Sequence, residues 1–104
     1  MLDAARDARS FVEGRSRADL DSDRMLAFAL VRALEIIGEA ANNVSAQGRA
    51  GLPAIPWADI VGLRHRVVHA YFNVDLDVVW QIVQVDVPTL IAELERSVPS
   101  PPPE

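Results

Sequence analysis

The sequence lacks cysteine, a long apolar run and a charge-free N-terminus. Without cysteine, neither disulfide bonds nor thiolate chemistry can contribute to stability or catalysis. Charged residues interrupt every apolar stretch well before the roughly 20 residues that a membrane-spanning helix needs, so we expect no membrane contact. Residues 1–9 carry several charges and no apolar core, which argues against a signal peptide. We therefore expect a soluble, cytoplasmic protein.

Lysine is also absent, so all ten basic residues are arginine, and 15 acidic residues leave a formal net charge of −5. Proteins that wrap duplex nucleic acid usually carry the opposite charge, because counterion release by Lys and Arg drives that binding. We therefore expect no DNA partner. Residues 46–73 depart from the acidic balance, since they hold three arginines and a single acid, Asp59. This segment is the cationic part of the chain.

Apolar residues recur at intervals of three and four along most of the chain, which is the spacing of an amphipathic helix. The pattern predicts helices at about 2–14, 24–46, 56–72 and 76–97, with a polar connector at 15–22, a loop at 47–56 and a break at 73–77. Pro88 should end or kink the last helix near Val87. We expect an all-α fold, an antiparallel bundle of four to five helices. It forms one domain, residues 1–97, followed by a proline-rich, disordered tail at 98–104.

Several residues mark the expected helix boundaries. Asp21 or Ser22 is suited to cap the N-terminus of the helix at 24–46, and Asn73 or Asp75 that of the last helix. Pro56 is suited to the first position of the third helix, where its missing N–H costs nothing.

The helix at 24–46 is apolar on more than one side. Beside its main stripe it carries five further apolar residues, namely Met25, Phe28, Val31, Leu34 and Ile36. A helix of this kind must be buried on more than one side. In so short a chain, this favours contact with a second subunit.

The segment RHRVVHAY, residues 64–71, gathers both histidines of the chain, two arginines and its only tyrosine. Arginine binds phosphate as a rigid planar fork and stabilises charge on a phosphorane, and histidine moves protons near neutral pH. On an ideal helix Arg64 and His69 would lie about 140° and about 7.5 Å apart, so a long arginine could still reach a cleft that His69 lines. The pair is the minimum needed to cleave RNA, whose 2′-hydroxyl supplies the nucleophile without a metal.

This chemistry needs a base for the 2′-hydroxyl and an acid for the departing 5′-oxygen, but His69 is a single group. A symmetric dimer that joins the two third helices would place two His69 and two Arg64 side chains around one phosphate. The surplus apolar surface of the second helix independently favours such a dimer.

The residues alone leave other interpretations open. A histidine on a helix is more often a surface residue or a satisfied core residue than a catalyst. His65 and His69 are four residues apart and could instead be two metal ligands, with a third from Asp59 or Asp75. Tyr71 is by default a boundary aromatic whose hydroxyl faces water.

The motif Arg-x4-His-x-Tyr in RHRVVHAY resembles that of the HepT-like toxins, which belong to the HEPN superfamily of metal-independent ribonucleases. The resemblance extends over IPWADIVGLRHRVVHAYFNVDLDVVWQIVQVDVPTL, residues 55–90, and over RALEIIGEAANNV, residues 32–44. It thus covers most of the chain between residues 24 and 94. Arg-x4-His alone is a weak pattern, whereas these blocks together are specific.

The resemblance implies a role for five residues. Arg64 and His69 fall on the catalytic positions, and His65 stands where the family commonly has asparagine. Tyr71 falls on the position to which a nucleotidyltransferase antitoxin of the MntA type attaches AMP. Glu39, a signature residue of the second helix, would be either a buried acid that faces the arginine or a structural residue.

The resemblance therefore implies the toxin of a type VII-like HepT/MntA toxin–antitoxin pair: a homodimeric, metal-independent endoribonuclease that needs no cofactor and acts on RNA such as tRNA or mRNA. AMP added near the cleft would place negative charge where substrate phosphate must bind. The alternative is a non-catalytic helical module that only docks the nucleotidyltransferase.

Overall fold

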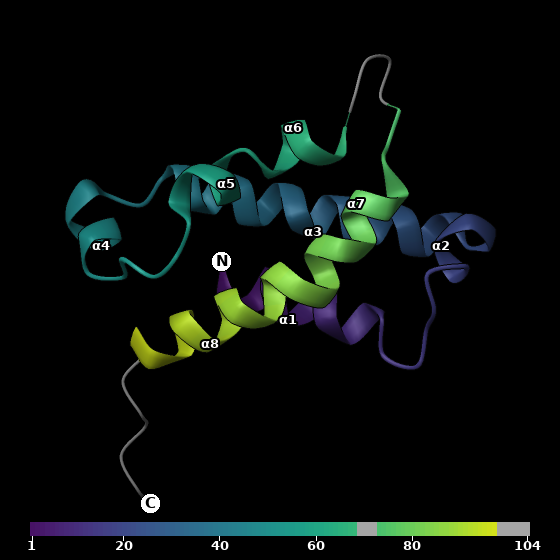
Figure 1. Cartoon of the computed structure of the whole chain (residues 1–104), viewed down its shortest axis with the longest axis horizontal. Helices are drawn as coiled ribbons and strands as arrows, with labels where there is room; N and C mark the ends of the chain where they lie inside the picture. The colour runs from purple at the N-terminus through teal and green to yellow at the C-terminus, as the bar shows by residue number, and fades with distance from the viewer. Residues whose placement is uncertain (69–72, 98–104) are drawn as a thin grey trace, which may run out of the picture.

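The computed structural model describes residues 1–68 and 73–97 (Figure 1). Most of this part is helical. The helices are α1 (Leu2–Phe11), α2 (Asp19–Ser22), α3 (Arg24–Asn42), α4 (Ala46–Ala50), α5 (Trp57–Val61), α6 (Leu63–Val67), α7 (Leu76–Gln81), the π-helical η2 (Ile82–Asp86) and α8 (Val87–Ser97). An isolated bridge between Val68 and Val74 is the sole β pairing among the described residues. The all-α prediction is confirmed, and the predicted tail at 98–104 lies outside the described residues.

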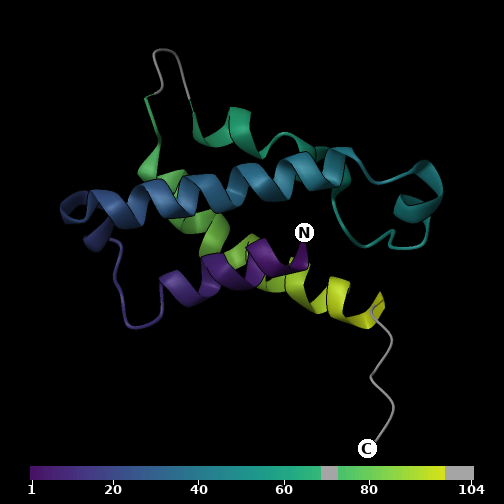
Figure 2. The ribbon, with the colours of Figure 1, turned by 180° about the vertical axis from the view of Figure 1, so that it is seen from behind.

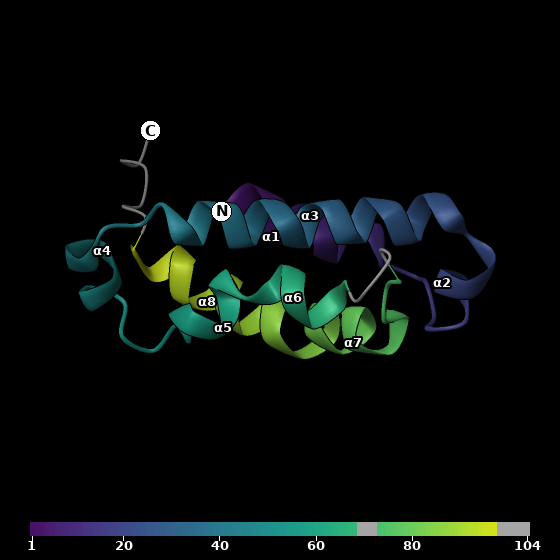
Figure 3. The ribbon, with the colours of Figure 1, turned by 90° about the horizontal axis from the view of Figure 1, so that it is seen from above.

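The helices form two layers. In Figure 3, α1 and α3 lie in one layer, and α5 to α8 lie in the other. The long α3 contacts α1 within its own layer, and α5, α6 and α7 in the other. Figure 2 shows α1 beside α8, the first and last helices of the chain, where Arg6 forms an ion pair of 3.1 Å with Glu95. The bundle is therefore closed by a contact between its two ends.

The core lies between the two layers. Leu30, Leu34 and Ile37 of α3 are fully buried, at the spacing of three and four that the sequence shows. Burying a side chain of this size stabilises the fold by about 1.5–3 kcal/mol. On α1 the buried residues are alanines, and their small size brings its backbone close to α3 and α8. No helix in the described part of the chain is long and apolar enough to cross a membrane.

The N-terminus of α3 is capped by Asp23, which accepts a hydrogen bond of 3.1 Å from the Leu26 N–H. The prediction of Asp21 or Ser22 is wrong, because both residues belong to the short α2, a helix that the sequence did not indicate. The prediction for the last helix is confirmed at Asp75, whose carboxylate accepts from the Val78 N–H at 3.2 Å.

The segment after α3 is more ordered than a plain loop. α3 ends at Asn42, four residues earlier than expected, and the short α4 follows it. Ser45 caps α4, because its hydroxyl accepts from the Gly48 N–H at 3.0 Å. Ser45 and Gly51 are therefore the N-cap and C-cap residues of a short helix and not parts of an irregular loop.

The predicted third helix is split into α5 and α6 at Gly62. Pro56 occupies the N-cap position of α5 and not its first turn. α6 ends at Val67, because Val68 is extended, with φ −113° and ψ 118°, and bridges Val74. The Asp75 N–H also donates to the Val67 carbonyl, at 2.8 Å. A continuous helix at 56–72 is therefore a wrong prediction.

The last helical run is not broken at Pro88, which lies in α8, but it contains the π-helical turn η2 directly before that helix. The Val87 N–H donates to the Ile82 carbonyl, five residues back, so the Val83 carbonyl loses the donor that an α-helix would give it. Pro88 has no N–H to offer in return. Instead, Arg9 of α1 donates to the Val83 carbonyl at 3.0 Å. The sequence thus located the disturbance near Val87 correctly, but it did not predict its form.

Candidate functional site

A groove between α3 and α6 brings together three of the residues that the sequence selects. Arg64, His65 and Glu39 all line it. The groove has a volume of about 260 Å³. Its other lining residues are Glu35, Gly38, Asn42 and Val61. We refer to it as the α3–α6 groove.

α3 contributes a polar stripe to the groove. Glu35, Glu39 and Asn42 are separated by four and three residues, so they lie on one face of the helix. Sequence reasoning selected Glu39 but missed Glu35 and Asn42. The spacing of four and three was visible in the sequence, beside the apolar stripe of the helix. It indicates a groove lining only when it is known that α6 lies opposite this face of α3.

Gly38 allows α3 to approach the junction of α5 and α6 closely. A Cβ at this position would lie 3.2 Å from the Ile60 carbonyl oxygen and 3.5 Å from that of Val61. Both are backbone atoms, so a side chain would push the two segments apart. The glycine therefore keeps the Arg64 and His65 side of α6 near the polar stripe of α3.

The charges in the groove are partly balanced on α3 itself. Arg32 lies 3.6 Å from Glu35 and 3.8 Å from Glu39. Arg64 is exposed, and its side chain forms no ion pair or hydrogen bond with another residue in 1–68 or 73–97. Its guanidinium is therefore open to an anion that enters the groove.

Glu39 is exposed and not buried, with 69% of its side chain accessible. Of the two alternatives for Glu39, the buried acid is wrong, because the groove is open and leaves most of the Glu39 side chain in contact with solvent. Glu39 and Arg64 line the same groove, but the ion pair of Glu39 is formed with Arg32.

His69 and Tyr71 lie outside the described residues. The expected angle and rise between Arg64 and His69 assume a continuous helix, and α6 already ends at Val67. The same finding removes the helical basis for His65 and His69 as paired metal ligands. No group of three potential metal ligands occurs among the described residues.

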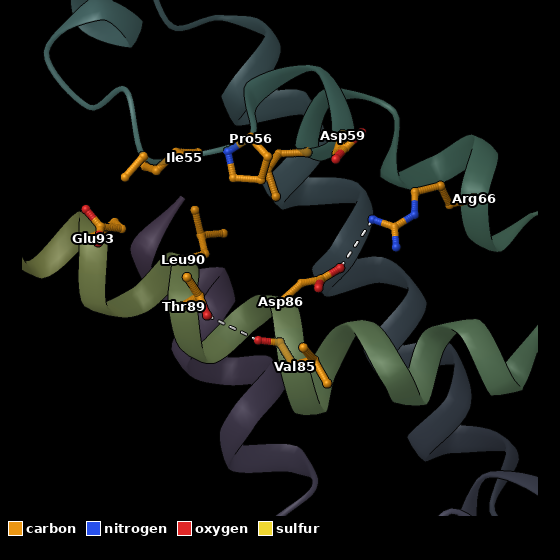
Figure 4. Close-up of a pocket in the computed structure, with 11 residues that line it drawn as sticks. Ile55, Pro56, Asp59, Arg66, Val85, Asp86, Thr89, Leu90 and Glu93 are labelled. Atoms are coloured by element: carbon orange, nitrogen blue, oxygen red, sulfur yellow. Dashed lines mark hydrogen bonds and ion pairs between the residues drawn. The ribbon is translucent and has the colours of Figure 1, made fainter.

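A second hollow lies among α5, α6, η2 and α8 (Figure 4). This α6–α8 pocket has a volume of about 250 Å³. Its lining residues are Ala54, Ile55, Pro56, Asp59, Ile60, Arg66, Val85, Asp86, Thr89, Leu90 and Glu93. Arg66 reaches Asp86 of η2 across it, at 3.3 Å. Asp59 therefore lines a different hollow from His65, and Asp75 is engaged as the α7 cap.

Fold and groove together define a small α-helical domain that presents an arginine and a histidine on a short helix, opposite a polar stripe on a long one. The chain belongs to the Ribonuclease HepT-like family, which matches residues 1–97. The resemblance seen in the sequence is thereby confirmed for the family.

Individual relatives agree with this assignment. The chain is 37% identical over 95 residues to "Putative RNase MJ1380" of Methanocaldococcus jannaschii, covering 91% of this chain and 87% of the relative. It is 41% identical over 78 residues to "Probable ribonuclease HepT" of Thermococcus cleftensis, covering 75% and 71%. It is 38% identical over 87 residues to "Putative RNase TTE0752" of Caldanaerobacter subterraneus subsp. tengcongensis, covering 84% and 74%. No solved structure matches the chain.

Proposed function

We propose that this protein is a metal-independent endoribonuclease and the toxin of a HepT/MntA-type toxin–antitoxin pair. The observation that carries the proposal is Arg64, a guanidinium without a described partner in a polar groove, on a chain of a ribonuclease family. The names of its relatives support the same activity. Arg64 and His69 are the proposed catalytic residues, and His65 is a supporting hydrogen-bonding group.

The proposed reaction is an intramolecular transesterification of RNA. The 2′-hydroxyl oxygen forms a bond to phosphorus as its proton passes to a base, and the bond from phosphorus to the 5′-oxygen breaks as an acid protonates that oxygen. The products are a 2′,3′-cyclic phosphate and a 5′-hydroxyl. Arg64 stabilises the extra negative charge on the phosphorane oxygens. One His69 serves as base, and the His69 of a second copy serves as acid.

The exposed apolar residues of α3 support the second copy. Met25 is 83% exposed and Phe28 is 60% exposed, and Ile36 also faces solvent. Large side chains of this type in contact with water favour association. A homodimer that covers them, and that brings two copies of residues 64–71 together, gives the composite site that the chemistry requires.

Regulation is proposed at Tyr71, by transfer of AMP from a nucleotidyltransferase antitoxin. The modification adds negative charge two residues beyond His69, which would repel substrate phosphate. RNA, a second copy and the antitoxin are therefore the proposed partners.

The test is RNA cleavage by the purified protein in EDTA. We expect cleavage with cyclic phosphate ends, and we expect its loss in Arg64→Ala and in His69→Ala, because each variant removes one proposed catalytic group. Circular dichroism should show unchanged helix content in both. Cleavage by both variants would overturn the proposed site. A folded wild-type protein that cuts no RNA yet binds the nucleotidyltransferase would instead support the docking module.

A further inference from the structure

The short helix α6, which carries Arg64, is weakly fixed by its own sequence. It has five residues, far fewer than an isolated helix needs to be stable. Gly62 precedes it and the extended Val68 follows it. Leu63 and Val67 anchor it, since both are buried in the core. These two residues are four apart and lie along one line of the helix, so they set which side of α6 faces the core. A contact away from that line is needed to limit rotation of α6 about it.

The ion pair between Arg66 and Asp86 provides this contact. The Nη1 atom of Arg66 lies 3.3 Å from the Asp86 carboxylate, and Figure 4 shows the side chain reaching across the α6–α8 pocket. Arg66 is about 200° from Arg64 around an ideal helix, so the two point to opposite sides of α6. A rotation that moves one of them therefore moves the other.

The position of Asp86 depends on the π-helical turn. Asp86 is the last residue of η2, whose extra residue per turn changes the direction of the side chains that follow. Arg9 stabilises this turn by donating to the Val83 carbonyl at 3.0 Å and to the Gln84 side-chain oxygen at 3.3 Å. The position of the Asp86 carboxylate is therefore set by the π-helical turn and by the contacts of that turn with Arg9.

Two further carboxylates, besides that of Asp86, line the same pocket as Arg66. Asp59 of α5 and Glu93 of α8 line the same hollow, yet the ion pair is formed with Asp86. Exposed ion pairs contribute little to folding stability, and both side chains of this pair are partly exposed. The main effect of the pair is therefore the orientation of α6 and not the stability of the bundle.

We propose that Arg66 and Asp86 are positioning residues, whose ion pair fixes the rotation of α6 and thereby directs Arg64 into the α3–α6 groove. The inference rests on the proposed ribonuclease function. It gives Arg66 a role distinct from that of its neighbour, because Arg66 acts through Arg64 and does not touch RNA.

The test is charge reversal with rescue, measured on a labelled single-stranded RNA that the wild type cuts. Arg66→Asp or Asp86→Arg places like charges opposite each other, and we expect kcat to fall about 10- to 100-fold through misplacement of Arg64. KM should stay nearly unchanged. The double variant, Arg66→Asp with Asp86→Arg, restores opposite charges and should recover most of kcat. Unchanged kcat in the single variants, or a folded double variant without recovery, would overturn the proposal.

A matched control is the ion pair between Arg6 and Glu95. It also joins two helices across the surface, at 3.1 Å, with side chains about half exposed. Arg6→Glu should shift the melting temperature about as much as Arg66→Asp, but it should leave kcat unchanged. An equal fall of kcat in this control would show a general effect of destabilisation and would contradict positioning.

Amide hydrogen exchange tests the geometry independently of activity. The Arg66 N–H donates to the Gly62 carbonyl at 3.2 Å, and the Val68 N–H donates to that of Arg64 at 2.9 Å. Both should exchange faster in each single variant and recover in the double variant. If the wild type cuts no RNA, the ribonuclease proposal fails, while this recovery still supports the ion pair as the element that fixes α6. Unchanged exchange rates would overturn that part.

Discussion

Arg64, His65 and Arg66 are consecutive residues with different surroundings. Arg64 and His65 line the α3–α6 groove, whereas Arg66 turns to Asp86 in the α6–α8 pocket. Because successive helical residues are about 100° apart around the axis, a helix little longer than one turn separates the roles. The guanidinium of Arg64 is open to a phosphate, while that of Arg66 is engaged.

A prediction at the residue scale concerns the Tyr71 hydroxyl. If it accepts AMP, co-expression with the nucleotidyltransferase should add about 329 Da, the mass of one AMP residue, or a multiple of it, to the wild-type mass. The added phosphate carries the negative charge that would block the cleft. Tyr71→Phe removes only the oxygen, so we expect no added mass, a similar melting temperature and persistent RNA cleavage in the presence of the enzyme. Intact-mass spectrometry and the cleavage assay measure both effects.

The control for this prediction is a variant that lacks a proposed catalytic group but keeps the Tyr71 hydroxyl. His69→Ala keeps Tyr71 and should still gain the AMP mass, although it cleaves no RNA. AMP found at another residue in the wild type, or neutralisation without any modification, would contradict regulation through Tyr71.

At the scale of the elements, the long helices were predictable and the site-bearing helix was not. The 19 residues of α3 give the apolar pattern enough turns to be unambiguous. In the third predicted helix, Ile60, Leu63 and Val67 keep helical spacing straight across Gly62, so the break leaves no trace in the pattern. The low helix propensity of Gly62 favours the break between α5 and α6, and the β preference of Val68 favours the end of α6. Whether such preferences prevail depends on tertiary contacts.

The candidate site was predictable to a similar extent. Arg64 and His65 stand in a motif, so the sequence selected them. Glu35 and Asn42 were missed, because a polar residue on a helix indicates a solvated face until the opposing element is known. The hollow that joins them to Arg64 arises from the close approach at Gly38.

A prediction at the element scale concerns acid stability at the N-terminus of α3. The Leu26 N–H and then Arg15 hold the pKa of Asp23 below its ordinary value of 3.8, and the Ser16 N–H does the same for Asp19. A carboxyl whose pKa is lowered by folding stabilises the native state above its unfolded pKa. This stabilisation is lost as the pH falls through the lowered value. We therefore expect the melting temperature to fall as the pH drops below about 4.

Asp23→Ala should lower the melting temperature at pH 7 by removing the cap, and the loss should shrink at pH 3. Asp21→Ala is the matched control, since Asp21 is exposed and does not cap α3. Thermal melts by circular dichroism measure both variants. An equal loss at pH 7 and pH 3 for Asp23→Ala would show that charge plays no part in the cap.

At the scale of the whole molecule, the protein is a thin plate of 43 × 34 × 17 Å, two helix layers deep. A plate of this kind has much surface for its core, so apolar residues of the long helix remain in water. Met25 and Phe28 lie toward the N-terminal end of α3, and the α3–α6 groove lies toward its C-terminal half. A second copy that packed along the whole length of α3 would therefore contact both the exposed apolar residues and the groove.

The prediction at this scale tests whether two copies share one site. Arg64→Ala and His69→Ala proteins are each expected to be inactive, because each dimer lacks both copies of one proposed catalytic group. A mixed dimer would hold one intact Arg64 and one intact His69 in the same cleft, and water would take the place of the second His69 in one of the two proton transfers. Mixing the two variants under conditions that exchange subunits should therefore restore part of the RNA cleavage, with native mass spectrometry reporting the mixed dimers. The double variant Arg64→Ala, His69→Ala serves as control, because mixing it with either single variant supplies only one of the two groups and should restore nothing. Mixed dimers without any recovery, or a monomer with full activity, would show that each subunit works alone.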